Sequence, residues 1–233
     1  MIINGSPQTY LRDNQLSFLR YAISFLIVFV LCAHASASED WGYSHNFLIQ
    51  KKINDRWSIV SKSQFNSRDD MREIFLGLAD LGFDYRLNDW LKIGGAYRGA
   101  WSLLRNNEYG YENRPMINIY ASKNLHQYFI SNLARFEFRQ FNYDLKDDVR
   151  FRNEIRIVFP VELTKMKLKP YLEEEFFYSF NAEEINANWI SAGLQYQVNK
   201  NVRIKTGYRW LRQKAGEKWF GRDVLVTGFV FSF

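Results

Sequence analysis

The segment from Ala134 to Phe141 reads ARFEFRQF and alternates apolar with charged side chains through Arg139. Successive side chains of a β-strand point to opposite faces, so Arg135, Glu137 and Arg139 would share one face and leave the other entirely apolar. Neither face suits an ordinary protein core. Lipid hydrocarbon can solvate the apolar face, and a closed interior with water and opposite charges can satisfy the charged one. The pattern therefore predicts a strand of a membrane-spanning β-barrel.

The same alternation recurs in other segments, including VRFRNEIRIVF from Val149 and KLKPYLEEEFFYSF from Lys167. We expect their charged faces to form a ladder that lines the lumen. Its members are Arg98, Glu112, Arg114, Arg135, Glu137, Arg139, Arg150, Arg152, Glu154, Arg156, Glu173 and Glu175. Mutual salt bridges that close the lumen are favoured over a selectivity lining. The same alternation places Glu174 on the lipid face, where a carboxylate is unfavourable. Either a bulge shifts the alternation at this point, or Glu174 lies near a membrane interface.

A specific register follows if the hairpin between these segments closes through residues 144–148. Arg135 would then lie opposite Glu154, and Glu137 opposite Arg152, with Arg139 near Arg150. Opposite charges that face each other across two strands stabilise a sheet. The expected ladder would therefore be structural and would not catalyse a reaction.

Alternating segments of about ten residues, separated by turn residues, continue to Phe233, and no helical period competes with them. We predict an all-β fold, an antiparallel transmembrane β-barrel. Eleven candidate segments can be counted, but bacterial single-chain barrels normally have an even number of strands. The expectation is therefore ten to twelve strands, with twelve slightly preferred. The first segment, from Trp41 to Lys52, would then lie partly within the lumen, or one segment would be misassigned.

The connections between segments suggest an orientation. Short ones are expected at 54–55, 88–89, 123–124 and 199–201, and longer polar ones at 68–72, 102–110, 144–148, 181–187 and 212–218. Short periplasmic turns and longer outer loops are typical of outer-membrane barrels. Aromatic residues expected beside these connections would form two interfacial girdles: Trp57, Trp90, Tyr128, Trp101, Tyr111, Tyr143, Trp210 and Trp219.

Residues 1–37 have the pattern of a cleavable signal peptide. An uncharged run from Tyr21 to Cys32 precedes Ala35-Ser36-Ala37, a small-x-small cleavage pattern. The run is shorter than the roughly 20 residues that a membrane-spanning helix needs. We therefore expect a signal peptide at 1–37 and an exported barrel domain at 38–233. Cleavage would remove the single cysteine, which excludes disulfides and thiol chemistry from the exported domain.

The C-terminal residues DVLVTGFVFSF place Phe229, Phe231 and Phe233 on one face of a final strand. A last strand of this kind resembles the signal that the outer-membrane barrel assembly machinery recognises. The expected location is the outer membrane of a Gram-negative bacterium, after export across the inner membrane. The formal net charge of +6 is compatible with a partner surface of anionic lipid and lipopolysaccharide, and we expect no nucleic-acid partner.

The chain resembles domain of unknown function 2490, a family of uncharacterised bacterial outer-membrane proteins. The resemblance covers about Trp41 to Phe233 and rests on the segments NDWLKIGGAYR, YENRPMINIY, ARFEFR, VRFRNEIRIVFP and KPYLEEEFFY. It implies a small outer-membrane barrel. The family has no active site whose residues could be assigned to this chain.

Three functions remain open from sequence. The favoured one is a non-enzymatic barrel with a narrow or plugged lumen, acting as a small-solute pore or an envelope scaffold. The second is an enzyme that modifies lipid or lipopolysaccharide, but the exported domain offers only His45, on the lipid face, and His126, in a turn. The third is a soluble periplasmic lipocalin-like barrel, which would turn its apolar face inward. No cofactor is expected, and no metal, because the acidic loop at 144–148 lacks the spacing of a calcium loop.

Overall fold

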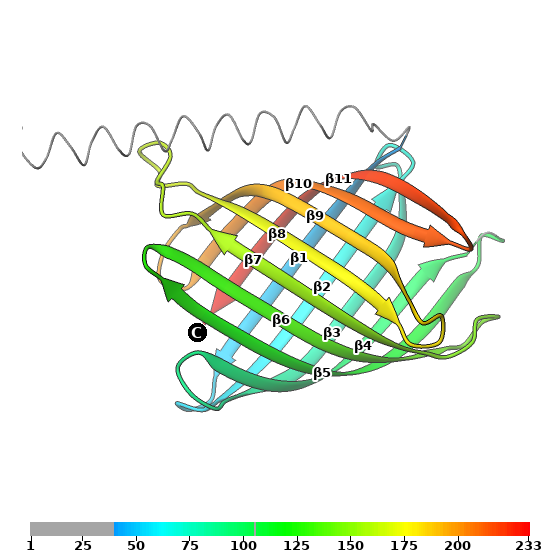
Figure 1. Cartoon of the computed structure of the whole chain (residues 1–233), viewed down its shortest axis with the longest axis horizontal. Helices are drawn as coiled ribbons and strands as arrows, with labels where there is room; N and C mark the ends of the chain where they lie inside the picture. Colours follow the sequence, from blue (N-terminus) through cyan, green and yellow to red (C-terminus); the bar gives the residue numbers. More distant parts are fainter. Residues whose placement is uncertain (1–39, 105) are drawn as a thin grey trace, which may run out of the picture. The chain divides into compact units, whose positions relative to one another are not determined.

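The computed structural model describes residues 40–104 and 106–233, which form a closed barrel of eleven β-strands (Figure 1). The predicted signal peptide lies outside the described residues. The strands are β1 (Trp41–Lys52), β2 (Trp57–Arg68), β3 (Glu73–Arg86), β4 (Leu91–Leu103), β5 (Tyr109–Leu125), β6 (Tyr128–Phe141), β7 (Asp148–Val158), β8 (Lys169–Ser179), β9 (Glu184–Gln197), β10 (Val202–Ala215) and β11 (Lys218–Ser232). None of the described residues forms a helix that is long and apolar enough to cross a membrane.

The closure between the first and last strands is parallel. Each strand pairs with the next in an antiparallel ladder, so in a barrel of eleven strands the first and last must run in the same direction. Accordingly, β1 pairs with β11 from Trp41 opposite Asp223 to Gln50 opposite Ser232. The all-β prediction is confirmed, and eleven strands lie within the expected ten to twelve, although the slightly preferred count of twelve is not confirmed for the described residues. β1 also pairs with β2 and therefore belongs to the wall, not the lumen.

The barrel has two rims. We call the one that holds Phe233 and the connections 53–56, 87–90, 126–127, 159–168 and 198–201 the C-terminal rim. The opposite rim holds the connections 69–72, 104–108, 142–147, 180–183 and 216–217. The expected contrast between short turns and longer loops is wrong, since the longest connection, 159–168, lies at the C-terminal rim.

The loops expected at the opposite rim are short because the strands continue into them. β10 and β11, for example, remain paired up to Ala215 and Lys218. Ladder hydrogen bonds join backbone groups and so do not require apolar side chains, which is why a polar stretch can extend a strand. Loop length therefore does not tell which rim faces the periplasm.

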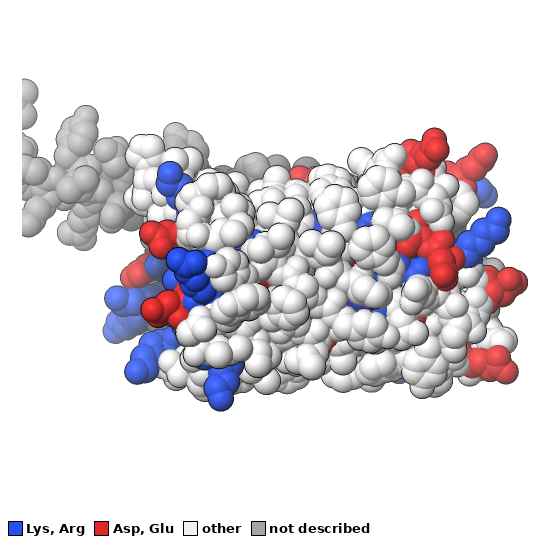
Figure 2. All heavy atoms as spheres, turned by 90° about the horizontal axis from the view of Figure 1, so that it is seen from below, with Lys and Arg blue, Asp and Glu red and all other residues white. Residues whose placement is uncertain are grey.

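The two faces of the wall differ as the alternation predicts. Large apolar side chains such as Leu81, Phe83 and Ile155 are exposed on the outside, and Leu81 is 64% exposed. Arg98 and Glu137 point inward and are 1% and 0% exposed. On the side that Figure 2 shows, charged side chains are sparse over the middle of the wall and gather at both ends, with blue prevailing at one end and red at the other. A soluble lipocalin-like barrel needs the reverse arrangement, so this structure contradicts that alternative.

Glu174 is an exception on the outer face. It lies in the middle of β8, is exposed, and accepts a hydrogen bond from Asn188 Nδ2 at 3.0 Å. The register of β8 against β9 shifts only later, between Phe177 and Tyr178. The bulge therefore does not turn Glu174 inward, and the side chain amide of Asn188 satisfies part of the carboxylate.

Candidate functional site in the barrel lumen

A single carboxylate, that of Glu137, organises the lumen. Guanidinium nitrogens of five arginines surround it, at 2.5 Å for Arg150, 3.0 Å for Arg152, 3.3 Å for Arg114 and 3.6 Å for both Arg98 and Arg135. These six residues, which we call the Glu137 cluster, come from the consecutive strands β4 to β7. The alternation of apolar and charged residues along each strand places each of them on the inner face.

Three more carboxylates offset part of the positive charge of the Glu137 cluster. Asp80 binds Arg98 through two hydrogen bonds of 2.6 and 2.7 Å. Glu112 binds Arg114 in the same two-point manner and also accepts hydrogen bonds from Arg139 at 2.7 and 3.1 Å. Glu175 accepts hydrogen bonds from Arg152 at 2.6 and 2.9 Å. Two-point contacts of this kind hold the planar guanidinium groups in fixed orientations.

Solvent scarcely reaches this section of the lumen. Glu137 is 0% exposed, and Arg98, Glu112 and Arg114 are also buried. On the β8 side the ring of Phe177 lies 4.4 Å from the Arg152 guanidinium carbon, a cation–π contact. A buried charge network persists only when its members satisfy one another, and here they do. The Glu137 cluster therefore lies in a section of the lumen that is largely buried from solvent.

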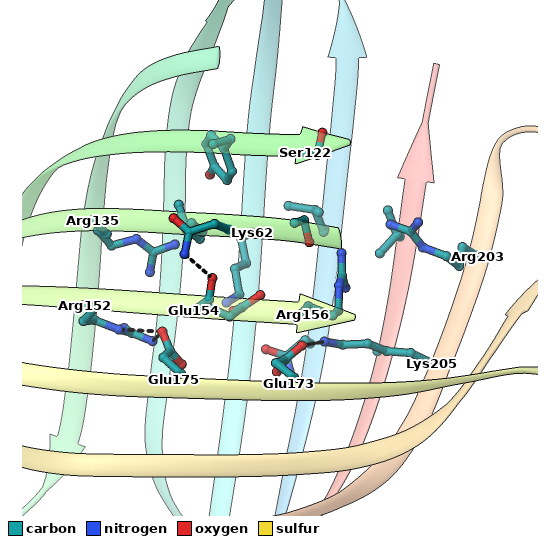
Figure 3. A pocket seen from close by; sticks show the side chains of 18 of the residues that line it. Lys62, Ser122, Arg135, Arg152, Glu154, Arg156, Glu173, Glu175, Arg203 and Lys205 are labelled. Atoms are coloured by element: carbon teal, nitrogen blue, oxygen red, sulfur yellow. Dashed lines mark hydrogen bonds and ion pairs between the residues drawn. The ribbon is translucent and has the colours of Figure 1, made fainter. Parts of the chain in front are cut away.

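The lumen widens towards the C-terminal rim. A cavity of about 290 Å³, which we call the chamber, is lined by residues that include Lys62, Glu154, Arg156, Glu173 and Arg203 (Figure 3). A second cavity of about 510 Å³ lies among the connections of the C-terminal rim. Lys92 and Ser122 line both cavities, so the chamber adjoins the space at this rim.

A smaller ion-pair group lies on the wall of the chamber. Glu173 contacts Lys205 Nζ at 3.3 Å and Arg209 Nη2 at 3.2 Å. Arg209 also donates a hydrogen bond to Ser191 Oγ at 3.0 Å and stacks over Trp189. Arg209 is thereby fixed to the wall and does not extend freely into the chamber.

The expected register between β6 and β7 is wrong by two residues. Arg135 lies opposite Arg152, Glu137 opposite Arg150, and Arg139 opposite Asp148. Like charges can face each other because arginine side chains are long enough to reach carboxylates diagonally, as Arg152 reaches Glu137. The register instead aligns the rings of Phe136 and Phe151 on the outer face, with centroids 5.0 Å apart.

All twelve residues of the predicted ladder lie on the inner face, and the structure divides them by height. Six form the Glu137 cluster, Glu112, Arg139 and Glu175 border it, and Glu154, Arg156 and Glu173 line the chamber. Sequence reasoning missed the inward residues Lys62, Asp80, Asn118, Arg203, Lys205 and Arg209. The alternation of Arg203, Lys205 and Arg209 with apolar neighbours was a signal that could have found three of them.

The acidic loop at the opposite rim uses its carboxylates within the fold. Asp147 Oδ1 accepts a hydrogen bond from the Phe141 amide at 3.0 Å, and Asp148 Oδ1 accepts one from Ser179 Oγ at 2.9 Å. No group of three metal-ligating side chains occurs among the residues that the structure describes. Burial, with the Glu112 carboxylate, raises the pKa of the Tyr143 phenol in this loop above its ordinary value. Tyr143 is therefore a neutral neighbour of the charge network.

The C-terminal phenylalanines occupy the outer face and the rim. Phe229 stacks against Phe47 of β1 and against Phe231, with centroids 5.6 and 6.4 Å apart. The Phe233 amide donates a hydrogen bond to the Gln50 carbonyl at 3.0 Å. The side chain of Phe233 is exposed. The last strand thus presents an aromatic face next to the parallel closure.

Replacing Glu137 with glutamine should lower the free energy of unfolding by about 3–5 kcal/mol, because it leaves four buried arginines and the partly buried Arg150 without their shared carboxylate. Urea unfolding of the purified barrel in lipid vesicles measures the change. Glu162→Gln is the matched control, since Glu162 pairs with Lys167 and Lys169 on an exposed connection. The control should cost less than about 1 kcal/mol. Equal losses in the two variants would contradict the central role of Glu137.

Comparison with one solved structure, a porin, supports the barrel fold. A porin, NanC, is 11% identical with a TM-score of 0.52, and the match covers 83% of this chain and 99% of NanC. LpxR from Salmonella typhimurium is 10% identical with a TM-score of 0.43, covering 82% of this chain and 87% of LpxR. No curated protein matches the chain. The family described as "Protein of unknown function (DUF2490)" matches residues 41–221. The resemblance seen in the sequence is thus confirmed, and the chain belongs to this family.

Proposed function

We propose that this chain is a non-enzymatic outer-membrane β-barrel of a Gram-negative bacterium whose lumen is plugged by the Glu137 cluster. The observation that carries the proposal is the burial of Glu137 and of four of its five arginines, all but Arg150. Because the charges of the Glu137 cluster contact one another, they act as a structural plug and not as a selectivity lining. The protein would serve the envelope as a scaffold, or as a pore that conducts only after the plug rearranges.

Two features support the membrane location. The outer wall is apolar over its middle, and charges lie at both ends, as a bilayer requires (Figure 2). Exposed Trp57 and Trp90 lie at the C-terminal rim, and exposed Tyr111 and Trp219 lie towards the opposite rim. Aromatic side chains at two levels are favourable at the two lipid–water interfaces. Lipid and lipopolysaccharide would therefore surround the wall.

Purified protein in planar bilayers should show little or no steady conductance. The double variant Arg139→Ala with Arg150→Ala should conduct, because it removes two guanidinium groups that hold Glu112 and Glu137. Lys146→Ala, on an exposed loop of the opposite rim, is the control and should behave like the wild type. Large and stable channels from the wild-type protein would refute the plug and support a porin.

The C-terminal strand provides the orientation in this proposal. We assign the exposed Phe233 to an assembly signal read by the barrel assembly machinery, which would make the C-terminal rim periplasmic. In support, Phe229, Phe231 and Phe233 form an exposed or half-exposed aromatic end to the last strand. A signal peptide ending near Ala37 would deliver the chain to the periplasm.

Replacing Phe233 with serine should block outer-membrane assembly, so that the chain accumulates in the periplasm or is degraded. The amount that resists carbonate extraction measures assembly, and the wild-type chain should remain in the membrane fraction. Tyr109→Ser is the control, because Tyr109 is also an exposed aromatic residue but begins β5 near the opposite rim. Equal membrane levels of Phe233→Ser and wild-type protein would exclude the targeting role.

A second candidate function, an enzyme acting on lipid, is supported by a polar cluster on the outer wall. His45 Nδ1 lies 2.6 Å from Thr227 Oγ1 and 3.0 Å from Tyr43 Oη, and Tyr43 Oη lies 2.6 Å from Thr227 Oγ1. A hydroxyl beside an imidazole is the arrangement of a nucleophile and its base. However, no carboxylate hydrogen-bonds to His45 within the described part of the chain, and the ring packs against Phe47 at 4.5 Å. We therefore favour the non-enzymatic function.

The two functions differ in their effect on membrane lipids. Under the favoured function, cells that produce the wild-type protein and cells that produce His45→Asn should have the same lipid A and phospholipid acyl composition by mass spectrometry. His126→Asn is the control, because His126 lies in the turn between β5 and β6. A lipid change that appears with the wild-type protein and disappears only with His45→Asn would establish the enzyme.

A further inference from the structure

The chamber carries an excess of positive charge. Its lining includes eight lysine and arginine side chains but only three carboxylates, those of Glu154, Glu173 and Glu175. Several of these cations already have partners: Glu173 pairs with Lys205 and Arg209, and Glu175 pairs with Arg152. Two of the three carboxylates, Glu173 and Glu175, are therefore already neutralised by ion pairs within the fold. The remaining cations decide what the chamber can bind.

Three cations in the chamber form no ion pair with any carboxylate in the described ranges. They are Lys62 on β2, Arg156 on β7 and Arg203 on β10, and Figure 3 shows all three in the chamber. Their strands lie at separate places around the barrel, so they approach the chamber from different walls. Three unneutralised cations that converge on a partly enclosed space attract negative charge strongly, because the surrounding protein screens less than water.

Arg156 gives an independent indication. Its Nε atom is buried and has no hydrogen-bond partner in the structure. A buried guanidinium donor without an acceptor is costly, and native proteins rarely leave one unsatisfied. An anion with oxygen acceptors would satisfy Arg156 and at the same time neutralise the cations around it.

From these two observations we propose that the chamber is a binding site for a small polyvalent anion, a molecule that carries two or more carboxylate or phosphate groups. Polyvalence follows from the positions of Lys62, Arg156 and Arg203 on three walls, since one monovalent ion could contact only part of the set. Glu154 is the lining carboxylate that lacks an ion pair, and the three free cations outnumber it. The net field therefore stays positive, and Glu154 disfavours anions that approach its own side of the chamber.

Size and access agree with a small ligand. The chamber volume of about 290 Å³ is at the lower end of the range for small-molecule sites. Neutral hydrogen-bonding groups, among them Ser122 and Asn132, also line it. The adjoining cavity at the C-terminal rim provides the entrance, whereas the Glu137 cluster closes the other side. The anion would therefore enter and leave at the same rim.

The test is calorimetric titration of the full barrel, purified in a nonionic detergent, with citrate and with inorganic phosphate, and with glucose as an uncharged probe. Citrate should bind more tightly than phosphate, and glucose should not bind. The double variant Arg156→Gln with Arg203→Gln should lower the citrate affinity at least about tenfold, because it removes two charged hydrogen-bond donors. Lys165→Gln is the matched control, since it removes one positive charge from an exposed connection at the same rim.

Three results would overturn the proposal: no citrate binding up to about 10 mM, equal affinity of the double variant and the wild type, or an equal loss in Lys165→Gln. Heat-modifiable migration on gels verifies that each variant folds. If the double variant fails to fold, Lys62→Met from the opposing wall replaces it, with the same tenfold expectation. Binding is measured in detergent without a membrane potential or a current, so its failure is distinguishable from failure of the plugged-barrel function.

Discussion

The structure depends on one problem of electrostatics, which is how to place Glu137 and five arginines inside a barrel that excludes water. Moving an unpaired charge from water into a protein interior costs more free energy than the whole stability of a typical fold. Here each guanidinium of the Glu137 cluster contacts Glu137 and most contact a second acceptor, Asp80, Glu112, Glu175 or Asn118. The network is satisfied only when strands β3 to β8 stand side by side, so the plug and the closed wall support each other.

This arrangement makes the lumen unequal along its length. Near its middle, every guanidinium group of the Glu137 cluster contacts a carboxylate, and Arg152 packs against Phe177 and Trp189. In the chamber, towards the C-terminal rim, cations outnumber carboxylates, and Lys62, Arg156 and Arg203 remain without ion pairs in the described chain. One part of the interior thus stabilises the fold and another retains charge for a ligand. Binding sites are often of this second kind, because their polar groups are not used up by folding.

The parallel contact between β1 and β11 has a consequence for the outer wall. It brings Tyr43 and His45 beside Thr227, and Phe47 beside Phe229, although these residues are at opposite ends of the sequence. The polar cluster and the aromatic stack therefore exist only because the barrel closes. A closed barrel also removes the free edges that would otherwise pair with other chains, so the odd strand number does not leave an edge exposed.

The sequence alone determined which face of each strand is charged, because the residues alternate with a period of two and a β-strand places alternate side chains on opposite faces. That was enough to predict the all-β barrel and the inward position of all twelve ladder residues. It could not determine the register of β6 against β7. Long arginine side chains reach carboxylates diagonally across the strands, so matching opposite charges directly across them does not identify the register. The rings of Phe136 and Phe151, which lie opposite each other, show the register only once the two strands are paired. Nor could the sequence determine the strand number, the loop lengths or the pairing of His45 with Thr227. Those depend on closure of the whole sheet, which is a property of the tertiary structure and not of any segment.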